Sequence, residues 1–263
     1  MKRLLTSLFL GACTLASGAP PLRDVLLSTG RAAEDFWTRF AVVNCSETVS
    51  QQKLAKDGKL ICRKDTTYDY VVLTRKAGRD LVVEESRVSV RTAGKDKNMS
   101  LLVTNGFPAL LFIFHPYFQG SYEFSQPVET DLGGQPVLQI QFRQAHDGRS
   151  PSCLRLRGRD YPLEWAGTAW IESRSGSVVK IVAGLDASIQ ELGLQRLTAE
   201  VTYAPVELSG EGQRQWLPSE AVITAQTAQQ RWRNTHRFTD YKHFSVDVKS
   251  KTEAPKAVTG GTP

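Results

Sequence analysis

The sequence predicts a mainly β protein of the α+β class. In this fold, a curved antiparallel up-and-down sheet, or half-open β-barrel, wraps around a short apolar helical plug and is preceded by an N-terminal helix. Stretches of alternating apolar and polar residues recur with turn residues between them. One segment, 109–114, is apolar on every side. A sheet of about nine or ten strands must also curl, because strand twist accumulates, and its concave face then needs filling.

The N-terminus has the composition of a secretory signal peptide. Residues 1–18 combine a basic start, a short apolar core and small residues after it. Ordinary cleavage after the small residues 16–18 (Ala-Ser-Gly) gives a signal of residues 1–18. Alternatively, residues 10–13 (Leu-Gly-Ala-Cys) resemble a bacterial lipobox, which would shorten the signal to residues 1–12 and place a lipid on Cys13. Both alternatives predict export from a bacterial cytoplasm.

Residues 20–40 predict the N-terminal helix. Phe36, Trp37 and Phe40 follow Val25 at helical spacing, so that one side of the helix is apolar. This side is expected to pack against the sheet that follows.

Strands are predicted from period-two alternation and from the turn residues that bound it. The predicted strands are 42–51, 60–75, 80–91, 138–142, 168–172, 177–185, 197–203, 221–227 and 231–246. Asp57 and Gly58 form a hairpin turn between the first two. Residues 145–163 are polar, basic and irregular, and predict the longest loop.

Residues 101–118 are the most apolar part of the mature chain. Each exposed large apolar side chain would forgo roughly 1.5–3 kcal/mol of burial, so a segment without a polar face must be surrounded. A bilayer span needs about 20 such residues, more than this segment offers. Pro108 suits a first helical position and Pro116 ends the element. We predict a short buried helix, and a buried strand is the alternative.

Four stretches resemble a known family. Residues 167–176 (Gly-Thr-Ala-Trp-Ile-Glu-Ser-Arg-Ser-Gly), 216–219 (Trp-Leu-Pro-Ser) and 237–244 (Arg-Phe-Thr-Asp-Tyr-Lys-His-Phe) resemble the later half of exported bacterial proteins of the lipoprotein-carrier (LolA/LolB-like) superfamily. Residues 43–49 (Val-Asn-Cys-Ser-Glu-Thr-Val) resemble the first strand of its poorly characterised members. The resemblance covers most of the mature chain as a pattern of strands and turns. It implies a half-open β-barrel with helices in its mouth, whose apolar hollow holds acyl chains in the best-known members. We assign none of the carriers' functional residues to positions in this sequence.

The domain organisation follows from these elements. One LolA-like β domain is predicted over 19–247, followed by a disordered tail over 248–263 that is rich in Lys, Thr, Gly and Pro. We expect the protein in the periplasm or outer membrane of a Gram-negative bacterium, with secretion as the alternative. It would be membrane-associated if Cys13 carries a lipid.

Charge and cysteine content limit which partners and which disulfide bonds are expected. The formal net charge of +6 falls to +4 when Lys2 and Arg3 are removed with the signal, which is a mild excess spread along the chain. Because export is expected and no nucleic-acid-binding motif is present, no nucleic-acid partner is expected. An oxidising compartment permits one disulfide among Cys45, Cys62 and Cys153. Cys45 with Cys62 is the predicted pair because the two lie on neighbouring strands, although their hairpin needs a shifted register to bring them together.

The sequence contains none of the common catalytic motifs: no Gly-x-Ser-x-Gly elbow, His-Glu-x-x-His, phosphate loop or dinucleotide fingerprint. His236 and His243 are an odd number of residues apart on a predicted strand, so they face opposite sides and have expected surface or packing roles. No enzyme, metal or cofactor is therefore expected.

Aromatic residues are the candidates for lining a ligand cavity, and ordinary core packing is the alternative for each. They are Phe112, Phe114, Tyr68, Tyr70, Trp170, Tyr203 and Phe238. The first hypothesis is a non-enzymatic envelope protein that binds a lipid, a lipoprotein acyl chain or another apolar ligand in the concave face. The alternative is a structural or protein-interaction module of the envelope with a fully packed interior. A hydrolase is the third hypothesis, but the sequence suggests no catalytic residue for it.

Overall fold

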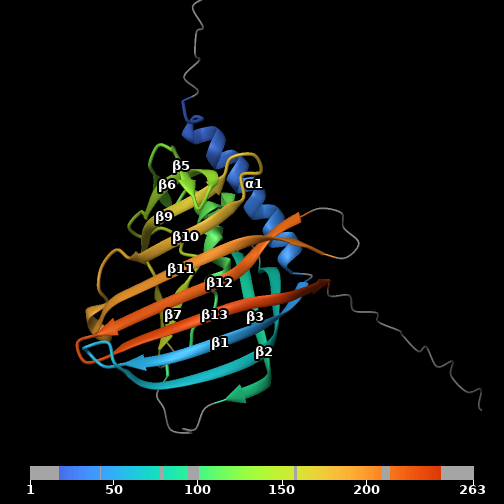
Figure 1. The fold of residues 1–263 in the computed structure, drawn as a ribbon. Helices are drawn as coiled ribbons and strands as arrows, with labels where there is room; N and C mark the ends of the chain where they lie inside the picture. Colours follow the sequence, from blue (N-terminus) through green and yellow to red (C-terminus); the bar gives the residue numbers. More distant parts are fainter. Residues whose placement is uncertain are drawn as a thin grey trace, which may run out of the picture.

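A computed structural model, which describes residues 18–41, 43–77, 80–93, 101–156, 159–208 and 214–243, confirms the predicted fold class. One curved, open antiparallel sheet forms most of the molecule, and helix α1 (Leu22–Phe40) lies across its open side (Figure 1). Residues 1–17 of the predicted signal and the whole predicted tail fall outside the described residues. Within the described ranges, no helix is both long and apolar enough to cross a membrane.

The sheet contains 11 strands in the order β3-β2-β1-β13-β12-β11-β10-β9-β6-β4, with β5 paired to β6. Its strands are β1 (Val43–Leu54), β2 (Leu60–Ala77), β3 (Asp80–Ala93), β4 (Tyr122–Phe124), β5 (Val128–Leu132), β6 (Gln135–Gln144), β9 (Trp165–Glu172), β10 (Val178–Leu185), β11 (Leu194–Glu207), β12 (Arg214–Thr227) and β13 (Arg231–His243). A short 3-10 helix, η2 (Gln190–Leu192), precedes β11. Most neighbours are joined by hairpins, as the alternation predicts, but β1 pairs with the last strand, β13.

This strand order explains why the plug is inside. Strands β3 and β4 are neighbours in the order of strands along the chain but lie at opposite edges of the sheet, so their connection has to run from one edge to the other, and its buried part lies on the concave side. The connection contains the 3-10 helix η1 (Phe107–Phe114) and the short helix α2 (Pro116–Gln119). All 8 residues of η1 are buried. The predicted buried helix is confirmed, and Pro116 marks its end as expected.

Helix α1 closes the concave side over η1. Phe36 and Trp37 of α1 pack against Phe112, with ring centroids 5.7 and 5.3 Å apart. On the sheet side, the Tyr203 hydroxyl of β11 donates a 3.0 Å hydrogen bond to the carbonyl of Pro108. The core therefore consists of three layers, with the plug between the helix and the sheet.

Residues 145–163 contain more regular structure than the sequence predicts. The strands β7 (Cys153–Leu156) and β8 (Arg159–Pro162) pair as a separate hairpin. Each strand has only 4 residues, which is too short for alternation to be recognised against the basic composition.

The predicted disulfide between Cys45 and Cys62 is wrong, because both thiols are free. In the ladder between β1 and β2, Cys45 lies opposite Tyr70, whereas Cys62 lies opposite Lys53. The two cysteines are therefore about 25 Å apart at the usual rise per residue, far beyond the Cα separation of a disulfide.

Candidate functional site

Most of the predicted cavity residues belong to the packed core. The five that are buried are Tyr70, Phe112, Phe114, Tyr203 and Phe238. Tyr70 and Phe238 contact each other with ring centroids 5.4 Å apart, and Phe114 stacks on Phe124 at 5.3 Å. Tyr68 is half-buried. The buried rings are therefore packed against one another or against neighbouring core residues.

Trp170 does not line a cavity on the concave face, contrary to the prediction. It lies on β9 between Ala169 and Ile171, both of which are fully buried, so its own side chain points to the opposite face. There the ammonium group of Lys180 lies 5.7 Å from the centre of the indole ring. Trp170 therefore belongs to the outer surface and does not line the concave face.

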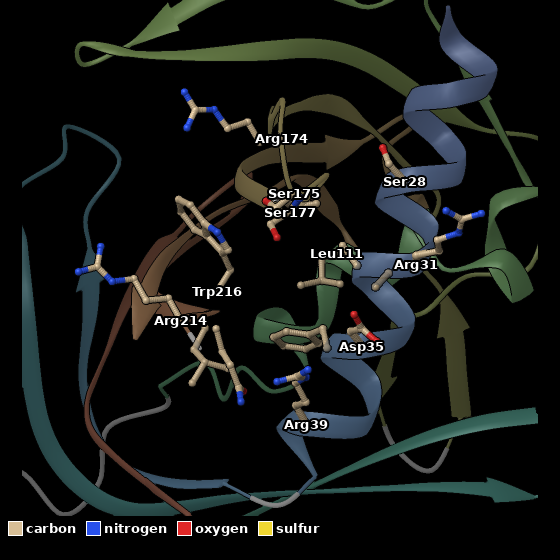
Figure 2. Close-up of a pocket in the computed structure, with 16 residues that line it drawn as sticks. Ser28, Arg31, Asp35, Arg39, Leu111, Arg174, Ser175, Ser177, Arg214 and Trp216 are labelled. Atoms are coloured by element: carbon tan, nitrogen blue, oxygen red, sulfur yellow. Dashed lines mark hydrogen bonds between the residues drawn. The ribbon is translucent and has the colours of Figure 1, made fainter. Parts of the chain in front are cut away.

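Two clefts flank the plug. The first has a volume of about 440 Å³ and lies between α1 and the sheet. Figure 2 shows α1 along one wall, η1 at the back, and residues next to β10 and on β12 along the other wall. The labelled residues are Ser28, Arg31, Asp35 and Arg39 on α1, Leu111 on η1, and Arg174, Ser175, Ser177, Arg214 and Trp216 opposite. The rim is polar and rich in arginine, whereas the floor is apolar.

The second cleft has a volume of about 500 Å³ and lies between η1, β3 and the segment 101–106. Its lining is mostly apolar, with a few polar groups at one end. The lining residues are Trp37, Leu81, Val83, Glu85, Leu102, Val103, Thr104, Asn105, Gly106, Phe107, Ala109, Phe112, Phe118, Pro151, Ser152, Leu163 and Leu197. Phe112 is the predicted cavity residue that borders it.

A buried carboxylate, Glu47 of β1, forms the centre of a polar network beside the second cleft. Its side chain is fully buried and accepts hydrogen bonds from Arg87 of β3, including one of 3.0 Å from Nη2. Its Oε1 atom lies 2.7 Å from Nδ1 of His236 on β13. Burial raises the pKa of the Glu47 carboxyl, but the hydrogen bonds from His236 and Arg87 outweigh this effect and hold the pKa below its ordinary value.

The network continues from His236 to the segment that leads into the plug. Nε2 of His236 lies 2.6 Å from the hydroxyl of Thr104, and Asn234 donates a 3.0 Å hydrogen bond to the same hydroxyl. Asn234 and Gln51 also donate to the carbonyl of Leu102, at 2.8 and 2.7 Å. Side chains from β1 and β13 therefore hold this segment against the concave wall of the sheet.

A second carboxylate, Glu85, completes the network at β3. It accepts a 2.6 Å hydrogen bond from the hydroxyl of Tyr70 and forms an ion pair with Arg87 at 2.7 Å. Burial, together with the negative charge of Glu85, raises the pKa of the Tyr70 hydroxyl well above its ordinary value. Tyr70 is therefore a neutral hydrogen-bond donor at ordinary pH, and both carboxylates have partners.

Sequence reasoning missed this network. One signal was available, because Glu47 lies between Cys45 and Val49 on the side of the strand that was predicted to be apolar, and a buried carboxylate requires a partner. No local pattern points to Arg87 or Thr104. Arg87 reaches Glu47 across β2, through the ladders that join β1 to β2 and β2 to β3, whereas His236 is brought beside Glu47 by the pairing of β1 with β13.

Comparison with known proteins provides little further guidance. No protein-family description and no curated protein match the chain. Among solved structures, the chain is similar to MucB in the crystal structure of MucB in complex with MucA(peri). The two share 9% sequence identity, the match covers 85% of this chain and 99% of that chain, and the TM-score is 0.21. A likeness this weak supports no argument about fold, location or partner.

Proposed function

We propose that the protein is an interaction module of the bacterial cell envelope that binds another protein, and that it does not carry an acyl chain in its concave face. The observation that supports this proposal best is the burial of η1, whose 8 residues occupy the place where a carrier would hold its ligand. The proposed envelope location depends on the signal-like composition of residues 1–18.

The first cleft has the composition of a protein-binding surface. Trp216 and the arginines Arg31, Arg174 and Arg214 line it, and Trp and Arg are the residue types that contribute most to protein interfaces. Its floor is formed by buried apolar side chains such as Leu111, so that an apolar centre lies inside a polar rim. This arrangement suits a peptide segment that inserts an apolar side chain.

Mass spectrometry of the intact protein under native conditions tests the acyl-carrier alternative. Protein purified from bacterial membranes should show the mass of the mature chain without noncovalently bound lipid. A stoichiometric, noncovalent lipid adduct would contradict the proposal. Phe112→Glu adds a discriminating measurement: it should unfold the whole domain if the interior is packed, whereas a cavity protein would keep its strands and lose only the lipid.

Site-specific photo-crosslinking in the cell tests the partner. A photoreactive residue at Trp216 should give a discrete protein adduct, whereas one at Trp170, a half-buried tryptophan on the outer face of the sheet, should not. With the captured protein purified, Trp216→Ala should weaken its binding at least tenfold, and Trp170→Ala should leave it unchanged. Equal adducts at both positions, or equal affinities, would refute the first cleft as the contact surface.

A further inference from the structure

We propose that Thr104, His236 and Glu47 form a nucleophile, base and carboxylate that together hydrolyse small apolar esters in the second cleft. This activity goes beyond the proposed interaction function and uses different residues. A hydroxyl within hydrogen-bond reach of an imidazole, which is itself oriented by a carboxylate, is the diagnostic arrangement of nucleophilic hydrolases. The two distances are 2.6 Å from the Thr104 hydroxyl to Nε2 and 2.7 Å from Nδ1 to Glu47.

The hydrogen-bond partners place the protons where this reaction needs them. Glu47 has a lowered pKa and accepts hydrogen bonds, so the proton on Nδ1 of His236 points to it. In the tautomer with its proton on Nδ1, Nε2 carries a lone pair toward Thr104. In this tautomer the Thr104 hydroxyl donates to Nε2, while its oxygen accepts the hydrogen bond from Asn234. His236 is therefore positioned to remove the hydroxyl proton.

Backbone N–H groups beside Thr104 are available for the negative charge that develops on the substrate. The main-chain N–H groups of Asn105, Gly106 and Phe107 donate no hydrogen bond to any residue in the described part of the chain. These residues line the second cleft next to Thr104, and Gly106 adopts a left-handed conformation with φ of 78°. Free N–H groups adjoining a nucleophile are the donors from which oxyanion holes are built.

The cleft sets the class of substrate. Its walls include Trp37, Val83, Phe112 and Leu197, which suit an apolar acyl group, and its volume of about 500 Å³ limits the substrate to a small molecule. The carboxylate of Glu85 also borders the cleft, but Tyr70 and Arg87 already bind it, and we assign it no part in the reaction.

The reaction is an ester hydrolysis in two steps. In the first, the Thr104 oxygen forms a bond to the carbonyl carbon, its proton moves to Nε2 of His236, and the carbonyl oxygen becomes an oxyanion facing the N–H groups. The intermediate collapses with loss of the alcohol, which takes the proton from Nε2, and an acyl ester remains on Thr104. In the second step, water attacks this ester with the same proton transfers, so that ester and water give acid and alcohol.

Hydrolysis of p-nitrophenyl butyrate by the purified mature protein tests the proposal. We expect turnover above the rate in buffer, a loss of at least a hundredfold in both Thr104→Val and His236→Gln, and retained activity in Thr104→Ser. The matched control is Thr48→Val, at an exposed threonine on β1, which should keep full activity. Circular dichroism establishes that each variant is folded.

Identifying the residue that becomes acylated tests the proposal even if Thr104→Val or His236→Gln does not fold. Acid quenching during turnover, followed by peptide mass spectrometry, should place the butyryl group on Thr104 in the wild-type protein and on the new serine in Thr104→Ser. No turnover above buffer, a butyryl group only on lysine or another residue, or a folded Thr104→Val with wild-type activity would each overturn the assignment. Failure of this assay leaves the crosslinking test of the interaction function unaffected, because that test uses Trp216.

Discussion

Replacing Phe112 with alanine should destabilise the whole domain. Its side chain is only 1% exposed and packs against Phe36 and Trp37 of α1. Truncating a buried phenylalanine to alanine costs about 3–5 kcal/mol, because apolar contacts are lost and a cavity is left. This is a large share of the roughly 5–15 kcal/mol that holds a typical domain together. For a chain of this size, the midpoint of thermal unfolding should fall by about 6–20 °C.

Urea unfolding followed by circular dichroism measures this cost. Two controls separate packing from general loss of apolar surface. Phe112→Leu keeps much of the volume and should cost about half as much or less. Leu73→Ala removes a side chain that is 48% exposed, and should change the free energy of unfolding by no more than about 0.5 kcal/mol. A cost below about 1 kcal/mol for Phe112→Ala would refute the packed interior around η1.

Three further predictions concern the buried network, the sheet and the cysteines. Glu47→Gln should lower the free energy of unfolding by about 3 kcal/mol or more at neutral pH, because it leaves the guanidinium of Arg87 without the buried carboxylate that pairs with it. Since the pKa of Glu47 is lowered by folding, its contribution is present above its unfolded pKa and is lost as pH falls through its folded pKa. The difference in free energy of unfolding between variant and wild type, measured by urea titration, should therefore be smaller at about pH 3 than at about pH 7, and an equal difference at both would contradict this. Gly167→Ala should destabilise strongly, because a Cβ there would meet a backbone oxygen of the neighbouring strand, whereas Gly184→Ala, with its nearest contacts at 3.7 Å, should cost far less; equal melting temperatures would show the close approach to be wrong. Iodoacetamide should modify Cys62 at neutral pH and spare Cys45 until the protein unfolds, because burial raises the pKa of the Cys45 thiol to about 12; rapid modification of Cys45 detected by peptide mass spectrometry would exclude its burial.

The sequence predicts the architecture well where a local pattern determines it. The alternation over 197–203 reproduces the inward face of β11, because its apolar residues can be buried in only one register. The run over 109–114 predicts burial, because a segment without a polar face has no stable place at the surface.

Pairings between distant parts of the chain could not be predicted in the same way. The contact of β1 with β13 joins residues 43–54 to residues 231–243, and no short-range periodicity encodes it. This pairing places His236 beside Glu47, so the network is a product of topology. The predicted disulfide is wrong for a related reason. Two cysteines on neighbouring strands can still lie far apart along those strands, and only the register of the hairpin determines that distance.

The buried position of η1 in the concave face underlies both the fold and the proposed function, and hydrogen exchange measured by mass spectrometry tests it directly. In the native protein, peptides covering residues 107–114 should contain amides that exchange as slowly as the slowest amides of β11, because both would require global unfolding to open. Exchange of all the amides of this segment within seconds, while β11 stays protected, would contradict the burial of η1 against the concave face of the sheet.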